Sequence, residues 1–312
     1  MDSTSLDVHT GLYLSQDTSK RTRKEVPMTT KQIQALVIDS TFIHSGRISH
    51  LGSDQLMWLH DFEATGRDTV FFTDDMMDIS YKVTCKRKIA MLIEPPEISP
   101  HTYEYIKENA GVFDYILTYS RDLHTLFPNK CLWYPPSTIW TNRYEFSPKN
   151  KSLFVSLIAS NKKETSGQKL RQKIAEAVKE MTDIHVFGKG RDQELKNKED
   201  GLIPYQFSIA IENSVYDDYF TEKILDCFAT GTIPIYYGTK YIDHYFDSYG
   251  IIQFNNLEQL LSILEEIRSL PKTSIQEKYM RAAMRNFQMT ILNYKSTEDF
   301  LIKHYPFLFQ NG

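Results

Sequence analysis

Short apolar runs recur along the first half of the chain, and each has the length of a buried strand. They occupy residues 34–39, 70–73, 88–93 and 113–119. Between them, residues 53–64 place Leu56, Leu59 and Phe62 at helix-like spacing, residues 100–109 favour a second helix, and residues 120–127 favour a short helix or loop. Strands that alternate with helices predict an α/β lobe with a parallel sheet.

The same alternation restarts after residues 134–151, an irregular stretch that contains Pro, Asn and Ser and has no clear period. Predicted strands then fall at residues 151–158, 184–187, 205–211 and 232–237, and predicted helices at 167–181, 221–229 and 257–270. We therefore expect a second α/β lobe, joined to the first by the irregular stretch.

The predicted organisation has three parts. Residues 1–27 are polar and lack the apolar core of a signal peptide, so we expect a disordered tail or an added leader. Residues 28–140 are expected to form an N-terminal lobe, and residues 141–312 a C-terminal lobe with terminal helices. Two Rossmann-like lobes with parallel sheets would face a central crevice, and ligands of such sheets bind at the carboxyl ends of the strands.

Several common enzyme motifs are missing from the sequence. The first predicted strand is followed by Asp39-Ser40-Thr41 and not by a glycine-rich turn, which argues against an NAD-linked dehydrogenase. The patterns GxxxxGK[ST], GxSxG and HExxH do not occur, which argues against P-loop kinases, α/β-hydrolases and zinc proteases.

Composition narrows the class of protein further. Of 312 residues, 41% are hydrophobic, which is enough to build real cores, and the formal charge of −4 argues against a nucleic-acid partner. Cys85, Cys131 and Cys227 form no CxxC pair, so we expect neither a disulfide framework nor a zinc site. No apolar run approaches the roughly 20 residues of a membrane span, so we expect no membrane anchor and a cytoplasmic location.

The most informative segment is residues 207–238, in which a buried strand leads into a dense polar cluster and then a helix. Thr221 is a natural N-cap for this helix, and Lys223 lies in its first turn. Free main-chain N–H groups and the helix dipole favour an anion there. An isolated Thr-Glu-Lys triplet would be a solvated helix start, but the concentration of polar groups between strand and helix favours a functional site.

This segment resembles the donor-binding signature of the α1,3/4-fucosyltransferase family, through FSIAIENS, DYFTEK and GTIPIYYG. Residues 158–171, the Glu94-Pro95-Pro96 sequence and residues 113–122 are similar to further motifs of that family. The resemblance covers the C-terminal lobe well and nothing before about residue 80. It implies a GT-B fold and an inverting, metal-independent glycosyltransferase with no cofactor beyond its nucleotide sugar.

The resemblance also implies roles for individual residues. Those expected to bind the donor are Ser160, Asn161, Arg171, Glu212, Asn213, Ser214, Tyr219, Thr221, Glu222 and Lys223. Glu94 is implied as the general base, and Glu97 and Asp61 are alternative candidates. The prolines after Glu94 fix its backbone, which suits a base. The pairs Asp74-Asp75 and Asp217-Asp218 are not expected to bind a metal, because adjacent carboxylates on a strand point to opposite faces.

The acceptor side is less defined. His60 and Asp61, and also His44 and His50, are candidates for acceptor contacts, and Ser120-Arg121 replaces the family's paired arginines. The expected partners are a nucleotide sugar, with GDP-fucose favoured, and an oligosaccharide or glycoprotein glycan. The alternatives are transfer of another sugar, such as xylose from UDP-xylose, and a non-catalytic carbohydrate- or nucleotide-binding relative. Lacking the anchor and cysteine pairs of animal members, the chain resembles bacterial or viral forms, which in the viral case implies the host cytoplasm.

Overall fold

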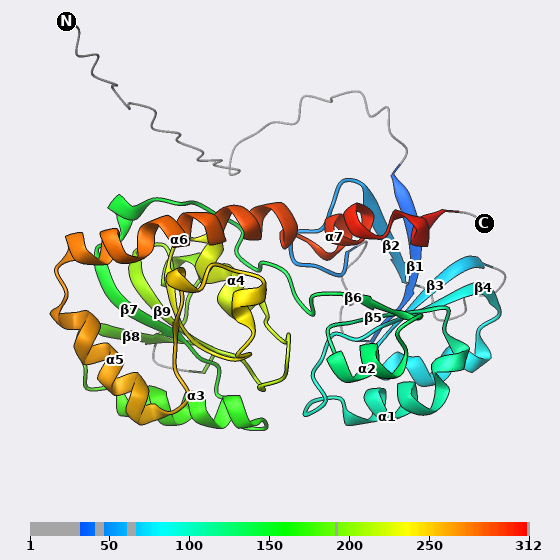
Figure 1. The fold of residues 1–312 in the computed structure, drawn as a ribbon, viewed down its shortest axis with the longest axis horizontal. Coiled ribbons are helices and arrows are strands. Elements are labelled where there is room, and N and C mark those ends of the chain that lie inside the picture. The colour runs from blue at the N-terminus through cyan, green and yellow to red at the C-terminus, as the bar shows by residue number, and fades with distance from the viewer. Residues whose placement is uncertain (1–31, 41–46, 61–66, 191–192, 311–312) are drawn as a thin grey trace, which may run out of the picture.

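The chain folds around two parallel β-sheets that lie side by side (Figure 1). The computed structural model describes residues 32–40, 47–60, 67–190 and 193–310, so the predicted tail of residues 1–27 lies outside the described part. Every strand pairing in both sheets is parallel. The predicted fold class, two α/β lobes with parallel sheets, is confirmed.

The first sheet has the strand order β2-β1-β3-β4-β5-β6. Its strands are β1 (Ile33–Ile38), β2 (Leu56–His60), β3 (Arg67–Thr73), β4 (Cys85–Met91), β5 (Tyr115–Thr118) and β6 (Cys131–Trp133). Its helices are α1 (Pro100–Asn109) and α2 (Arg121–Leu126), with the 3-10 helices η1 (Asp74–Lys82) and η2 (Ala110–Val112).

The second sheet has the order β11-β10-β9-β7-β8. Its strands are β7 (Leu153–Ile158), β8 (Ile184–Phe187), β9 (Tyr205–Ile211), β10 (Ile233–Tyr237) and β11 (Ile252–Gln253). The helices that follow β7 are α3 (Ser166–Ala177), α4 (Glu222–Ala229), α5 (Leu257–Ser269), α6 (Lys272–Asn293) and α7 (Thr297–His304). The remaining 3-10 helices are η3 (Pro148–Asn150), η4 (Lys198–Gly201), η5 (Ile242–His244), η6 (Ser248–Gly250) and η7 (Pro306–Phe309).

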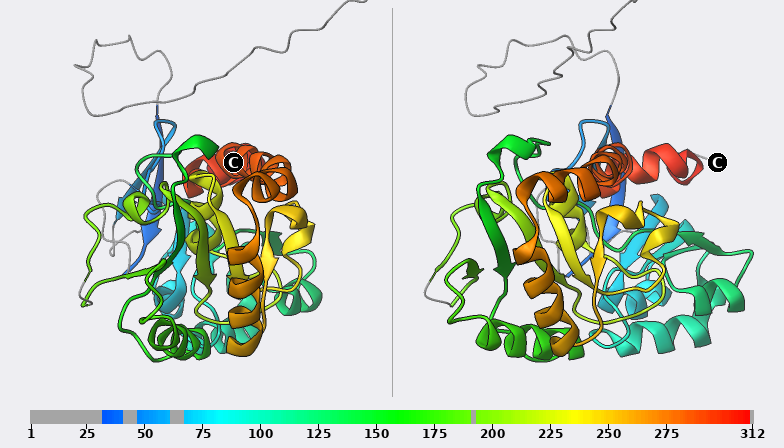
Figure 2. Two further views of the ribbon diagram at one scale, coloured as in Figure 1. Left: turned by 90° about the vertical axis from the view of Figure 1, so that its left-hand side faces the viewer. Right: turned by 60° about the vertical axis from the view of Figure 1, so that its left-hand side comes forward.

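Helices cover both faces of the second sheet. Side chains of α3, α5 and the start of α6, such as Ile174 and Leu264, share one core with Phe207 on β9. On the opposite face α4 packs through Ile224 and Phe228 into a second core. Figure 2 shows this layering from two further sides. Each such side chain contributes about 1.5–3 kcal/mol when fully buried, so this packing holds the helices against the sheet.

The predicted helix over residues 53–64 is wrong where the structure describes it. Residues Leu56–His60 form strand β2, which pairs with β1 in the register Ile33↔Leu56 to Val37↔His60. Leu56 and Trp58 are both 1% exposed, and they alternate with more exposed neighbours as strand residues do. A run this short fits period 2 as well as period 3.6, and pairing with β1 decides between them.

The end of the chain packs against the first sheet. Phe300 and Leu301 of α7 share a hydrophobic core with Val37, Trp58 and Phe71. Figure 1 shows α6 running along the second sheet toward α7, which lies next to β2. From the sequence we expected the terminal helices to belong to the C-terminal lobe, but α7 packs against the first sheet.

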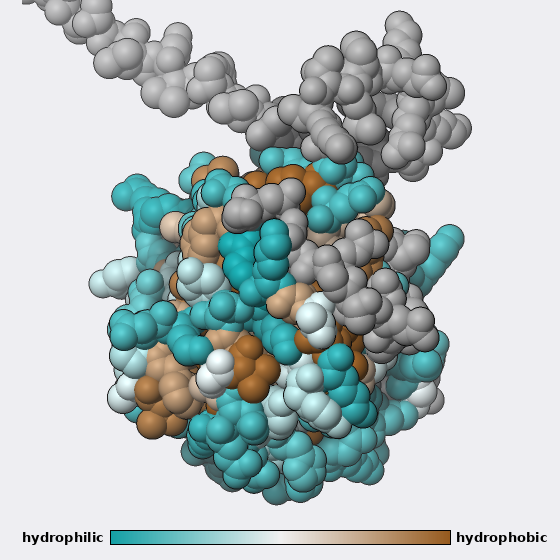
Figure 3. Space-filling model, turned by 90° about the vertical axis from the view of Figure 1, so that its right-hand side faces the viewer, coloured by the Kyte–Doolittle hydropathy of each residue, from teal (hydrophilic) through white to brown (hydrophobic). Residues whose placement is uncertain are grey.

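Figure 3 shows the face of the molecule on the side of the first sheet. This face is mainly hydrophilic, with scattered hydrophobic side chains. Within the described residues, none of the helices combines the length and apolar character needed to cross a bilayer.

Candidate functional site

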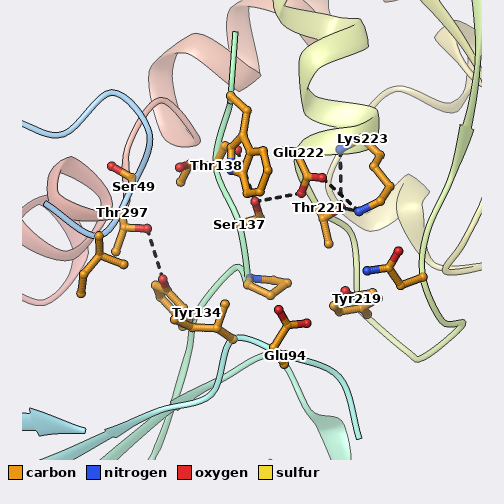
Figure 4. A pocket seen from close by; sticks show the side chains of 15 residues that line it. Ser49, Glu94, Tyr134, Ser137, Thr138, Tyr219, Thr221, Glu222, Lys223 and Thr297 are labelled. Carbon is orange, nitrogen blue, oxygen red and sulfur yellow. Dashed lines mark hydrogen bonds and ion pairs between the residues drawn. The ribbon is translucent and has the colours of Figure 1, made fainter. Parts of the chain in front are cut away.

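Two cavities meet where the carboxyl ends of the two sheets face each other. The larger, of about 450 Å³, lies mainly against β9 and α3, and the smaller, of about 210 Å³, extends toward α7. The residues that line both are Glu94, Trp140, Asn213, Glu222 and Lys223. Figure 4 shows the smaller cavity with Glu94 across from Lys223. This is the crevice in which the sequence predicts a ligand.

The loop between β9 and α4 is closed by a buried carboxylate. Glu212 is fully buried, and its two oxygens accept hydrogen bonds from the main-chain N–H of Thr221 at 2.8 Å and from its hydroxyl at 2.6 Å. Burial raises the pKa of Glu212, while Lys223 opposes the change. Glu212 was expected to bind the donor, but it lines neither cavity, and its carboxylate holds the loop between β9 and α4 instead.

The start of α4 presents a lysine between two carboxylates. Thr221 is the N-cap, as predicted, and its hydroxyl accepts from the N–H of Lys223 at 3.5 Å. The Nζ of Lys223 lies 3.0 Å from Glu222 Oε1 and 3.6 Å from Glu212 Oε2. Burial raises the pKa of Glu222, but Lys223 and Lys198 outweigh it and lower that pKa to about 2. An anion at this helix start must therefore share Lys223 with carboxylates, which the sequence did not predict.

Arg171 lies next to the end of β9. Its Nη2 donates to the carbonyl of Ile211 and to Asn213 Oδ1, the latter at 3.2 Å. Arg171, Asn213 and Ser160 all line the larger cavity. Asn161 does not line it, because its side chain donates to the carbonyl of Gly190 at 2.6 Å.

Gly167 was missed by the sequence analysis. Its N–H donates to the carbonyl of Asn213 at 2.9 Å, and a Cβ at this position would lie 1.9 Å from the carbonyl oxygen of Glu212. The absence of a side chain therefore lets the start of α3 touch the loop after β9. A glycine in the first helical turn is a weak signal that the sequence offered.

Glu94 follows β4 and is held through its main chain. Its N–H donates to the carboxyl oxygens of Asp74 at 3.2 and 3.3 Å, and its carbonyl accepts from the Tyr103 hydroxyl at 2.9 Å. The side chain is half-buried and lines both cavities. Burial raises the pKa of Glu94, with Lys223 acting in the opposite direction.

Glu97, the alternative base, is engaged in a contact between the lobes. Its carboxylate accepts from the Ser166 N–H at 2.8 Å, the Ser166 hydroxyl at 3.0 Å and the Ser214 hydroxyl at 2.6 Å. Burial acts to raise its pKa, but these hydrogen bonds lower it. Glu97 and Ser214 line neither cavity, so this pair connects the lobes beside the crevice.

A second contact between the lobes uses Asp218. Arg121 of α2 binds its carboxylate through Nε at 2.5 Å and Nη2 at 2.8 Å, and the guanidinium also lies over Tyr241, 4.1 Å from the ring centroid. Nearby, the rings of Tyr119 and Tyr219 are 5.1 Å apart. Asp218 is thus paired with an arginine, and Asp74 with main-chain N–H groups. Within the described residues no group of three or more His, Cys, Asp or Glu side chains could hold a metal ion.

Of the acceptor-side candidates that the structure describes, His60 and His50 line neither cavity. His60 ends β2, and neither of its ring nitrogens has a hydrogen-bond partner among the described residues. Asp61 and His44 lie outside the described residues. The Nε2 of His50 lies 3.0 Å from Asn142 Oδ1. Instead, the smaller cavity has hydroxyl groups from Ser49, Ser137, Thr138, Tyr134 and Thr297, none of them singled out by a sequence motif.

The chain is similar to known fucosyltransferases in sequence and in fold. The family model "Glycosyltransferase family 10 (fucosyltransferase) C-term" matches residues 148–297. A 4-galactosyl-N-acetylglucosaminide 3-alpha-L-fucosyltransferase 9 from Bos taurus is 27% identical over 191 residues, which is 57% of this chain and 48% of that protein. The alpha-(1,3)-fucosyltransferase FucT of Helicobacter pylori is 27% identical over 120 residues, 38% of this chain and 24% of that protein.

A solved α1,3-fucosyltransferase, with crystal structures that contain GDP and GDP-fucose, has the same fold. It superposes with a TM-score of 0.55 at 16% identity, covering 93% of this chain and 94% of that one. The chain spans about half the length of the curated mammalian relatives that it matches.

Proposed function

We propose that the chain, whose residues 148–297 match the model of glycosyltransferase family 10, transfers fucose from GDP-fucose to a hydroxyl group of a glycan. The observation that carries this proposal is the meeting of the two cavities at Glu94 and Lys223. A carboxylate and a cation face each other there, an arrangement that suits the displacement of a diphosphate by a hydroxyl group.

The larger cavity suits the nucleoside diphosphate. Its lining includes Lys162, Arg171, Lys198 and Lys223. As the bond between the sugar and the diphosphate breaks, negative charge develops on the leaving oxygen. Cations and helix N–H groups fixed beforehand stabilise that charge. We propose that these groups make a divalent cation unnecessary, so that transfer continues in EDTA.

Glu94 suits the role of general base. In the proposed step, Glu94 takes the proton from the acceptor hydroxyl as its oxygen attacks the anomeric carbon. The bond to the diphosphate breaks on the opposite side of the sugar, which inverts the configuration. The rigid hold on its main chain and its place in both cavities support this role. General-base catalysis contributes roughly 100- to 10,000-fold.

A donor panel followed by a transfer assay tests the proposal. Thermal shifts are measured with GDP-fucose, UDP-xylose and UDP-galactose, because a ligand at 100 times its Kd adds about 2.7 kcal/mol of stability. We expect GDP-fucose to give the largest shift and to support transfer to a glycan. A larger shift with UDP-xylose would indicate that the transferred sugar is xylose and not fucose. Binding without transfer to any glycan would favour a non-catalytic relative.

Glu94→Gln separates binding from chemistry. The variant is expected to bind GDP-fucose with an unchanged thermal shift and to lose at least about 100-fold in turnover, the lower end of the effect of losing a general base. The matched control is Glu104→Gln, whose exposed side chain lies outside both cavities. Full activity of Glu94→Gln would show that the base is elsewhere.

A further inference from the structure

Trp140 is an exposed aromatic residue at the junction of the two cavities. It is 44% exposed, whereas Trp58 is 1% exposed and packed against Phe71. Trp140 lines both cavities together with Glu94, Glu222 and Lys223. The exposed part of this ring lies where the two cavities join, so a ligand bound there can pack against it.

The backbone around Trp140 is held by buried groups. The N–H of Trp140 donates to Asp226 Oδ1 at 2.7 Å, and the preceding residue, Ile139, donates to the carbonyl of Tyr294 at 3.1 Å. Ile139 and Asp226 are both fully buried. The main chain that carries the exposed ring is therefore held in place.

An ion pair also holds the carboxylate of Asp226. The Nζ of Lys198 lies 2.6 Å from Asp226 Oδ2 and 5.4 Å from the centroid of the Trp140 ring. One buried carboxylate thus ties together the main chain of Trp140 and the cation next to its ring. A fixed main chain under an aromatic side chain suits a binding surface, because less conformational entropy is lost when the ligand arrives.

We propose that Trp140 is a specificity-determining residue that stacks on the transferred sugar of the donor. This inference rests on the proposed function. With the diphosphate near Lys223 and the base at Glu94, the sugar must lie between them, and Trp140 lines the cavities beside both residues. A pyranose presents C–H groups on one face, and an aromatic ring packs against that face. We therefore expect this ring to favour donors whose sugar has an extended apolar face.

Tryptophan fluorescence tests this stacking with the intact chain. The sequence has 3 Trp residues, of which Trp58 is buried and Trp133 is half-buried against Tyr245. We expect GDP-fucose to change the emission in the wild type and in Trp133→Phe, but not in Trp140→Phe. GDP alone is expected to leave the emission nearly unchanged, because it lacks the sugar.

Kinetics give an independent readout. Trp140→Ala is expected to lower kcat/KM for the donor by about 3- to 10-fold, the usual contribution of an aromatic contact, whereas Trp140→Phe keeps most of the activity because it keeps a ring.

Two results would overturn the inference and leave the proposed function in place. One is an equal emission change with GDP and GDP-fucose, which would put the ring against the nucleotide. The other is a thermal shift with GDP-fucose but no emission change. If no nucleotide sugar in the panel shifts the melting temperature, the proposed function fails first, and the stacking proposal fails with it.

Discussion

The buried carboxyl group of Asp74 accepts hydrogen bonds from the main-chain N–H of Glu94, at 3.3 Å to Oδ1 and 3.2 Å to Oδ2. Asp74 also accepts from the N–H of Ile93 at 2.9 Å, and its own φ of 28° is unusual for a residue with a side chain. Asp74 lines neither of the two cavities, yet it fixes the turn from which Glu94 enters both. The position of the proposed base therefore depends on a residue that touches no ligand.

Replacing Asp74 should affect turnover more than donor binding. Asp74→Ala leaves the main-chain N–H groups of Ile93 and Glu94 without this acceptor, so we expect a loss of about 1–3 kcal/mol in the free energy of unfolding. We also expect a fall in kcat at an unchanged Kd for the donor. The control is Asp75→Ala, because Asp75 is exposed and its loss should cost less than about 0.5 kcal/mol. An equal fall in kcat for both variants would contradict a positioning role.

Asp74 should also shape the pH dependence of stability. Burial raises its pKa to about 8, from 3.8. Between these values the folded chain holds a proton that the unfolded chain has lost, so stability falls as the pH rises through this window. Urea unfolding at pH 5, 6, 7 and 8 should show a steeper fall in the wild type than in Asp74→Asn, which cannot titrate there. Parallel profiles for the two proteins would show that Asp74 is ionised in the fold.

Gly167 should be required for the donor side of the crevice. A Cβ there would meet the carbonyl oxygen of Glu212 at 1.9 Å, so Gly167→Ala must push α3 away from the loop after β9. We expect about 1–3 kcal/mol of destabilisation and a weaker thermal shift with GDP-fucose. Gly111→Ala is the matched control, because nothing lies within 4 Å of its Cβ position. Normal donor binding by Gly167→Ala would show that the loop adapts.

Much of the fold followed from the alternation of apolar runs, and the cap at Thr221 followed from its residue type. The interlobe contacts did not, because Arg121 and Asp218 are 97 residues apart in sequence and Ser166 and Glu97 are 69 apart. Only the packed lobes bring such pairs together. Strand β2 was misread for a related reason, since its pairing with β1 overrides a local pattern that fits either element.

The Arg121 contact should stabilise the arrangement of the lobes. Its two hydrogen bonds to a buried carboxylate predict that Arg121→Ala loses about 1–3 kcal/mol in the free energy of unfolding. Arg143→Ala is the control, since Arg143 is more exposed and lies 3.7 Å from Glu145. Chemical unfolding measures both, and equal stability of the two variants would mean that the interlobe pair contributes little.

A crystal structure of the chain with GDP-fucose bound tests the central claim most directly. The account predicts the diphosphate in the larger cavity, within hydrogen-bonding distance of Lys223 at the start of α4, with the sugar directed toward Glu94. A nucleotide sugar bound outside this crevice, or bound with its diphosphate turned away from Lys223, would contradict it.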